Sequence, residues 1–443
     1  MIQAGFARVD ITPPLGMPIS GYFHARYAQD VRDPIEVNAL AFGNGTDTAV
    51  ILALDIVAMS QAHADDLRAR ISARTGSPAE HVMLCCLHQH TAICVGGREI
   101  FWPVKDELYL RHFYRKLADA AQMAVSDMSE ARVFAAEAQT KEEIAFVRRY
   151  RMADGKIRTN PNTEKYGIPV CRCDESDNTV RLLRFAREGK KDIAYVNFST
   201  HPDVIGGSRF SADWPGFVRR FVEKDNPDAL CISVTGFQGD SNHVDFFKET
   251  NEERYPHGKG YDHSRYMGRV IADTVKRIWN AGAEHTADEI FGDVQTVYNK
   301  TNTAGMEYYG EAVQYVREYE AGSPQSTAHI RDVATAYRIL DLQKAPIYQP
   351  VAVTVMGLGD ILFVGLGGEP FTAYTHAAHA AAGDKTVLCS CCTNGYQGYL
   401  PHARAFFEGG YEVNNTFFTA ELEEQCVEKM KEMLENFNLS KEK

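Results

Sequence analysis

An apolar run that stops at two histidines is the feature that most constrains the fold of this sequence. Residues 82–87 are apolar throughout, which predicts a strand buried on both faces of a sheet, and His88-Gln89-His90 follows at once. A second apolar strand at 49–56 and a helix at 62–74 precede it. This order predicts a β-α-β unit whose parallel strands bring both histidines to the carboxyl edge of the sheet.

Further apolar strands are also predicted to end in polar side chains. In chain order, these strands and the side chains after them are 193–198 with His201, 230–234 with Gln238 and Asp240, 361–366 with Glu369, and 386–392 with Tyr396 and Tyr399. Ligands of open α/β sheets gather at the carboxyl ends of strands, so we expect these side chains to converge. The predicted fold class is α/β, with a mixed β-sheet core flanked by helices and a site at the strand carboxyl ends.

The chain of 443 residues is predicted to form one large domain over 1–443. No internal repeat, low-complexity segment or linker divides the sequence into two parts. Residues 306–342 are amphipathic and rich in Tyr and Glu, with a break at Gly322-Ser323-Pro324. This pattern predicts a helical hairpin inserted between strands.

The charge balance and the cysteines limit the classes of partner. The sequence has 47 basic and 59 acidic residues, a net charge of −12, which argues against nucleic acid as a partner. The ten cysteines lie mostly inside apolar runs, as reduced core thiols do. No run reaches the roughly 18 apolar residues of a membrane span, and no signal peptide precedes the first strand. We therefore expect a soluble cytoplasmic protein with no integral membrane contact.

The order of the motifs is specific although each motif alone is weak. It runs from Asp10-Ile-Thr-Pro-Pro through His88-Gln-His-Thr, His201-Pro, Gly236-Phe-Gln-Gly-Asp and Gly368-Glu-Pro-Phe to Asn394-Gly-Tyr-Gln-Gly-Tyr. In this order the sequence resembles the catalytic domain of the neutral/alkaline (non-lysosomal) ceramidase family. The resemblance extends from Gly5 to about Asn415.

The resemblance implies one catalytic zinc ion held by two histidines, a glutamate and a tyrosine. On this sequence the implied ligands are His88, His201, Glu369 and Tyr399. Tyr399 is preferred to Tyr396 because the family has a further substrate-contacting tyrosine twelve residues on, where Tyr411 stands.

The resemblance also implies roles for residues around the metal. His90 corresponds to a histidine that meets the substrate or shuttles a proton, and Arg148 to an arginine near the scissile carbonyl, with Arg149 left open. We further expect Asp240 to accept a hydrogen bond from a ligand histidine and so fix its tautomer. A zinc ion with these ligands lowers the pKa of water to about 7. We therefore expect hydrolysis of an amide, or of an ester or lactone, with His90 protonating the leaving group.

Three departures from the family pattern bear on the substrate. Asn242 stands where the family has a catalytic serine, and Ser241 stands one residue early. Thr91-Ala92-Ile93 replaces Ser-Gly-Pro beside the histidines. The sequence also lacks the family's C-terminal immunoglobulin-like domain and a secretion signal. Together they favour a small, soluble substrate and attack by water without a serine.

Several alternatives stay open at this point. An N-acyl lipid of the ceramide type needs an apolar groove, for which the candidates are Phe101, Trp102, Phe406 and Phe407. A non-catalytic metabolite-binding protein is favoured if Glu369 or Tyr399 is missing, and both are present. The same ligands also suit iron or manganese. A homo-oligomer is left open.

Overall fold

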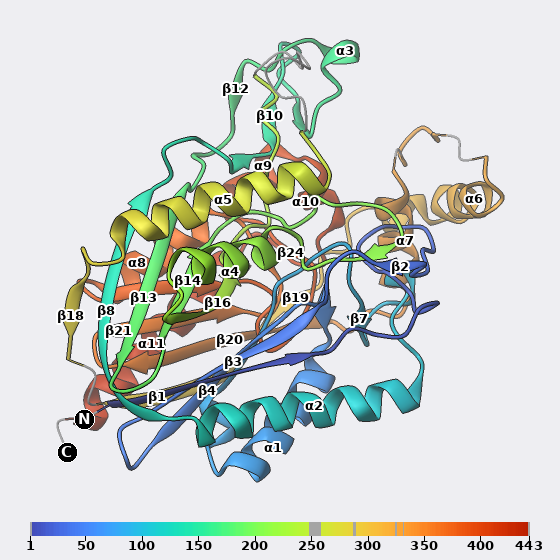
Figure 1. Cartoon of the computed structure of the whole chain (residues 1–443). Helices are drawn as coiled ribbons and strands as arrows, with labels where there is room; N and C mark the ends of the chain where they lie inside the picture. The colour runs from blue at the N-terminus through green and yellow to red at the C-terminus, as the bar shows by residue number, and fades with distance from the viewer. Residues whose placement is uncertain (1, 248–257, 287–288, 324–325, 331, 442–443) are drawn as a thin grey trace.

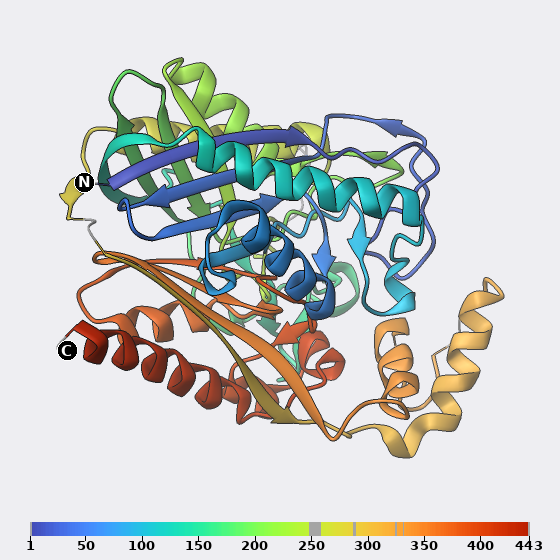
Figure 2. The same ribbon diagram turned by 90° about the horizontal axis from the view of Figure 1, so that it is seen from below.

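The computed structural model describes residues 2–247, 258–286, 289–323, 326–330 and 332–441, with side chains described as far as Phe437. Within these ranges two β-sheets lie face to face, and helices cover both outer faces (Figures 1 and 2). The predicted α/β class with a mixed sheet and flanking helices is confirmed. No helix of the described residues combines the length and apolar character needed to cross a membrane.

The larger sheet, as far as the chain is described, has nine strands. Their order is β16 (Ala229–Thr235), β14 (Asp192–Phe198), β13 (Thr179–Arg187), β8 (Ser129–Gln139), β1 (Ile2–Asp10), β3 (Glu36–Gly43), β4 (Thr48–Leu54) and β6 (Val82–Cys86), with β18 (Ala283–His285) beside β8. The predicted β-α-β unit is present, because β4 and β6 pair in parallel and α1 (Gln61–Thr75) joins them. The β14–β16 pair is also parallel.

The second sheet contains β19 (Ile290–Lys300), β20 (Tyr348–Leu358), β21 (Ile361–Leu366) and β23 (Thr386–Ser390). Its β21–β23 pair is parallel, so the polar segments after these two strands leave the sheet at one edge. We did not predict β19. This edge strand is mostly half-buried and carries polar residues, so it lacks the apolar run that marks the central strands.

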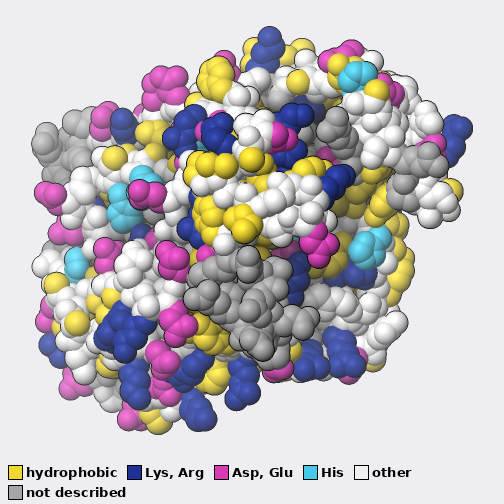
Figure 3. All heavy atoms as spheres, turned by 90° about the horizontal axis from the view of Figure 1, so that it is seen from above, with side chains coloured by type: hydrophobic (Ala, Val, Ile, Leu, Met, Phe, Trp, Pro, Cys, Tyr) yellow, Lys and Arg dark blue, Asp and Glu magenta, His cyan; other side chains and the backbone are white. Residues whose placement is uncertain are grey.

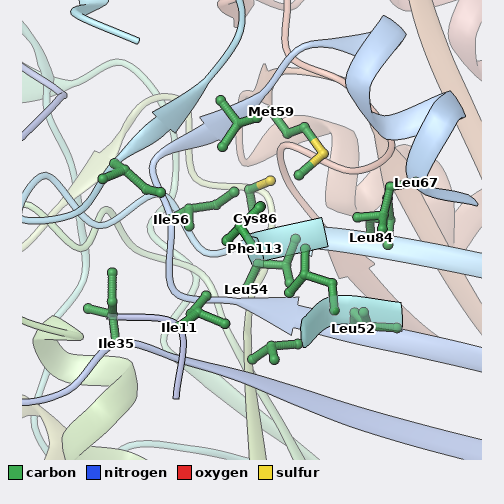
Figure 4. Packing of buried hydrophobic residues seen from close by; sticks show 14 of the residues in the cluster. Ile11, Ile35, Leu52, Leu54, Ile56, Met59, Leu67, Leu84, Cys86 and Phe113 are labelled. Carbon is green, nitrogen blue, oxygen red and sulfur yellow. The ribbon is translucent and has the colours of Figure 1, made fainter. Parts of the chain in front are cut away.

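The core lies in three layers set by the alternation of side chains along the strands. Leu40 and Phe42 of β3 point between the two sheets, where they pack with Phe363 of β21. Side chains on the other face of the sheet, such as Ala39 of β3 and its cross-strand partner Leu52 of β4, pack against helices α1 and α2 (Glu107–Ser126); Figure 4 shows Leu52 in this cluster. Further along the sheet, α4 (Asp213–Asp225) and α5 (Tyr261–Ile278) take that place, and α8 (Ala373–Ala382) and α11 (Leu422–Lys441) cover the second sheet.

The larger sheet divides at Gly5, which brings its two edge strands together. Beyond Ala4, β1 no longer pairs with β8, and the N–H of Phe6 donates to the carboxylate of Asp127 instead. A Cβ at Gly5 would lie 2.0 Å from the carbonyl oxygen of Ala124, so only glycine admits the end of α2 at this point. The part of the sheet from β8 to β16 then curves back over the other part, so that β16 contacts β3 and β4.

Helices α6 (Tyr309–Glu320) and α7 (Val333–Leu342) form where the hairpin was predicted, although residues 324–325 and 331 lie outside the described residues. The two helices pack on each other and project from the two sheets (Figure 1). Tyr319 donates to the carbonyl oxygen of Phe23, and Arg98 pairs with Asp341. These contacts join the helices to loops of the larger sheet; the single domain over 1–443 stays a prediction.

Candidate metal centre

Strand ends from both sheets supply the site. His88 follows β6, His201 follows β14, and Glu369 opens the short strand β22 (Glu369–Pro370) after β21. The hydroxyl of Thr235, the last residue of β16, donates to the carbonyl oxygen of Leu87 at 3.0 Å. The folding of the larger sheet therefore places the carboxyl ends of its two edge strands side by side.

Glu369 lies between the two imidazoles. Its Oε2 is 3.3 Å from Nε2 of His88 and 3.0 Å from Nε2 of His201, and the two ring centroids are 5.3 Å apart. All three side chains are nearly completely buried. The structure thus brings together three of the four residues implied as metal ligands.

Backbone carbonyls fix the tautomers of both histidines. Nδ1 of His88 lies 2.9 Å from the carbonyl oxygen of Val57, and Nδ1 of His201 lies 2.8 Å from that of Gln238 and 3.0 Å from that of Ser241. Each Nδ1 therefore carries a proton, so that each ring, when neutral, keeps its lone pair on Nε2. The expectation that Asp240 is the acceptor was wrong. Its Oδ1 accepts hydrogen bonds from the backbone N–H and the hydroxyl of Thr372 instead.

The electrostatics of this arrangement fit a bound cation. Two lone pairs and a carboxylate oxygen meet at one point, and they repel one another unless a proton or a metal ion lies among them. Burial alone raises the pKa of Glu369, but the imidazoles of His88 and His201 outweigh it and hold that pKa well below the usual value. The site therefore keeps an ionised carboxylate ready for a cation.

The loop that carries the histidines is held by a buried ion pair. His88 has a φ of 71°, in the left-handed region that non-glycine residues seldom occupy, so its backbone needs support. Next to it, the Gln89 amide donates to Oδ1 of Asp55 at 2.8 Å. Asp55 in turn accepts two hydrogen bonds from Arg219 of α4, at 3.0 and 2.5 Å. The pair anchors the loop to α4.

The two candidate tyrosines occupy different places. The hydroxyl of Tyr396 donates to Oε1 of Glu369 at 2.7 Å. Tyr399 begins β24 (Tyr399–Leu400), whose register pairs it with Glu369, and its ring is 5.8 Å from that of Tyr411. Burial, and next the charge of Glu369, raise the pKa values of both Tyr396 and Tyr399 well above the usual value. Tyr399 as the fourth ligand stays a prediction.

The two candidate arginines, Arg148 and Arg149, also have different partners. Arg148 donates to Glu412 at 2.8 Å and to the carbonyl oxygen of Gly239 at 2.9 Å, and its guanidinium lies 5.5 Å from the ring centre of Tyr399. Arg149 is fully buried and bonds to Glu408. The structure therefore places Arg148 beside Tyr399, and its contact with a substrate stays a prediction.

His90 is the third histidine of the cluster. Its ring centre is 5.0 Å from that of His88 and 5.9 Å from that of His201. One nitrogen from each of these three rings lies within 4.8 Å of the others, a spacing that suits a metal ion. Burial lowers the pKa of His90 to about 3, so the ring is neutral.

Other side chains around the site were less predictable. The hydroxyl of Ser241 lies 3.3 Å from the carbonyl oxygen of Ser199, and the Asn242 amide donates to Asn160 at 2.5 Å. Tyr22 and Asp203, which lie beside His90, were not predicted as site residues. Gly21-Tyr22 after the first strand and the aspartate that follows His201-Pro202 are the signals that mark them.

The comparisons with known proteins rest on structure alone. No family model and no curated protein matches the sequence. The neutral ceramidase from Pseudomonas aeruginosa superposes with a TM-score of 0.70 over 97% of this chain and 73% of that one. The chain has the neutral ceramidase fold. A structure titled "Ceramidase complexed with C2" matches with a TM-score of 0.68 over 97% and 74% of the two chains, and both neighbours are 15% identical.

Proposed function

We propose that this protein is a zinc-dependent hydrolase that cleaves an amide bond, or an ester or lactone bond, of a small soluble substrate in the cytoplasm. The observation that carries the proposal is the convergence of two imidazole lone pairs on Oε2 of the buried Glu369. The similarity to neutral ceramidase structures supports amide hydrolysis.

In this proposal His88, His201, Glu369 and Tyr399 hold the ion. Zinc supplies Lewis-acid polarisation of a carbonyl and makes water acidic enough to attack near neutral pH. Because Nδ1 of His88 and of His201 is bonded to a backbone carbonyl, each ring presents Nε2 with little loss of side-chain entropy.

The remaining residues act on the substrate. Arg148 is already neutralised by Glu412, so its proposed role is to orient and polarise the carbonyl rather than to bind an anion. Tyr411 lies against Tyr399 and is proposed to contact the acyl side. His90 is neutral and lies beside both ligand rings, which suits a group that takes a proton from water and passes it to the leaving nitrogen.

A second candidate is hydrolysis of an N-acyl lipid. The face that carries α3 (Thr163–Tyr166) and α9 (Ala403–Glu408) exposes large apolar side chains. Ile168 is 52% exposed, Val170 63% and Phe407 90%. Figure 3 shows apolar side chains gathered beside Lys and Arg on the corresponding face. Of the aromatics considered for a lipid groove, Phe101 packs edge-on against Tyr396 at the site.

The test is hydrolysis by zinc-loaded protein of p-nitroacetanilide, p-nitrophenyl acetate, a δ-lactone and a short-chain N-acyl lipid. We expect the wild type to cleave at least one of the three small probes, and Glu369→Gln to lose at least about 100-fold in kcat while remaining folded. The matched control is Glu137→Gln, a glutamate whose side chain is 62% exposed on β8. Unchanged activity in Glu369→Gln contradicts the proposal, and cleavage of the lipid alone selects the second candidate.

A further inference from the structure

The geometry points to Asp203 as a positioning residue that, together with Tyr22, orients His90 for proton transfer. The inference rests on the proposed hydrolase function and adds residues to the site that the strand-end pattern does not contain. Asp203 lies two residues after His201, on the segment that leaves β14. Its Oδ1 is 3.4 Å from Nδ1 of His90.

Tyr22 also holds the carboxylate of Asp203. Its hydroxyl donates to the same Oδ1 of Asp203 at 2.5 Å. Burial, and next the charge of Asp203, raise the pKa of Tyr22 far above the usual value, so the hydroxyl keeps its proton and acts as a donor. The Tyr22 ring meets the His90 ring edge-on, with centroids 5.5 Å apart. Tyr22 therefore contacts both members of the pair.

The glycine-rich loop after β1 closes around His90. A Cβ at Gly21 would lie 2.7 Å from Cγ of His90, so glycine is needed for this approach, and the φ of +105° at Gly21 also favours it. Arg26 donates to the backbone carbonyls of Ser20 and His90 at 2.7 and 2.8 Å, and its guanidinium lies 4.1 Å from the Tyr22 ring centre.

The placement of Asp203 decides which nitrogen of His90 is available. Neither ring nitrogen of His90 has a hydrogen-bond partner among the described residues, so Asp203 is the carboxylate in place to take the Nδ1 proton. With the Nδ1 proton directed at Asp203 across this 3.4 Å, Nε2 keeps the lone pair. Nε2 then accepts one proton from the attacking water and delivers it to the leaving nitrogen as the C–N bond breaks. The products are a carboxylic acid and an amine, and the ring ends neutral, as it began.

Two chromogenic substrates with the same acyl group distinguish a positioning role of Asp203 from a purely structural one. p-Nitrophenyl acetate releases a phenolate that leaves without protonation, whereas the leaving nitrogen of p-nitroacetanilide must be protonated. We expect Asp203→Ala to lower kcat for p-nitroacetanilide about 10- to 100-fold with KM unchanged, because it removes the partner that orients His90. For p-nitrophenyl acetate the loss should be clearly smaller, because His90 still takes the proton of the attacking water but the phenolate needs no proton to leave.

Milder substitutions at Asp203 and Tyr22 should give smaller losses of anilide activity than Asp203→Ala. Asp203→Asn keeps a carbonyl oxygen facing His90 and should recover part of the anilide activity. Tyr22→Phe removes only the hydroxyl and should cost less than Asp203→Ala. The matched control is Tyr109→Phe, because the hydroxyl of the half-buried Tyr109 donates to the carbonyl oxygen of Ile11 away from the site. Zinc content should be equal in all of these proteins.

Equal losses on both probes, or loss of zinc in Asp203→Ala, overturn the inference and assign Asp203 a structural role only. If the zinc-loaded wild type cleaves neither probe, the hydrolase proposal fails for these acyl compounds. The role of Asp203 is then tested independently of activity, by the tautomer of His90. Long-range ¹⁵N NMR of histidine-labelled protein should show His90 protonated at Nδ1 in the wild type and a tautomer mixture in Asp203→Ala. An unchanged His90 tautomer overturns the inference.

Discussion

The hydroxyl of Tyr396 donates a 2.7 Å hydrogen bond to Oε1 of Glu369, while Oε2 of the same carboxylate faces His88 and His201. The two carboxylate oxygens therefore have different partners. One is held by the protein, and the other is directed at the point where the imidazole lone pairs meet. A carboxylate held in this way binds one ion with a defined orientation.

This relationship separates the roles of the two tyrosines. Tyr396→Phe should weaken zinc binding about 10-fold, because it removes a hydrogen bond to a ligand without removing a ligand. Tyr399→Phe should abolish the visible charge-transfer band that a tyrosinate ligand gives with Cu²⁺. Absorption spectra of Cu²⁺-loaded variants check both. A band that disappears in Tyr396→Phe and survives in Tyr399→Phe would show that Tyr399 is not the ligand.

The buried pair of Asp55 and Arg219 should carry much of the stability near the site. Asp55→Ala leaves the buried Arg219 guanidinium with only the longer 3.4 Å contact to Glu36, which should lower the free energy of unfolding by about 3 kcal/mol. The variant should also bind zinc more weakly, because Gln89 loses its acceptor. Urea unfolding checks the first effect and calorimetric zinc titration the second. A loss below 1 kcal/mol would speak against this role.

Gly239 should be irreplaceable for a steric reason. A Cβ there would lie 2.2 Å from the backbone carbonyl oxygen of Glu369, so alanine must displace the ligand's own backbone. We expect Gly239→Ala to lose zinc binding. Gly310→Ala in α6 is the matched control, because apart from the adjacent residues and the helix's own backbone no atom lies within 4 Å of the added Cβ, and it should be neutral or stabilising by about 0.5–1 kcal/mol. Zinc bound at wild-type level by Gly239→Ala would refute the steric argument.

Zinc affinity should depend on pH through His88. Burial favours the neutral ring, but the carboxylate of Glu369 outweighs it and raises the pKa of His88 in the metal-free protein to about 9. Zinc must displace that proton, so affinity should rise about tenfold per pH unit from pH 6 to 8 and level off above pH 9. Titration calorimetry in buffers of different ionisation enthalpy should show about one proton released per zinc at pH 7. A pH-independent affinity would contradict this.

The strand ends were predictable because a buried parallel strand must be apolar and the residue after it reaches the edge of the sheet. For this reason His88, His201 and Glu369 stood out in the sequence, and the structure brings them together. The sequence could not decide between Arg148 and Arg149, because successive side chains of extended backbone point to opposite sides and no sequence pattern marks which side meets the site.

The remaining residues depend on contacts between distant segments. Asp240 follows a strand as the ligands do, but its carboxylate turns to Thr372. The acceptors for the ligand histidines are backbone carbonyls, which any residue type provides. Tyr22 reaches His90 through a glycine loop about 180 residues from Asp203. The division of the larger sheet at Gly5 depends on the end of α2, and no local pattern marks it.

The metal content of the purified protein tests the central claim most directly. Elemental analysis after equilibration with zinc should find about one ion per chain in the wild type and almost none in the His88→Ala/His201→Ala variant. The control variant His112→Ala/His285→Ala alters two histidines outside the site and should keep its zinc. Equal zinc in the wild type and the His88→Ala/His201→Ala variant would contradict the metal centre described above.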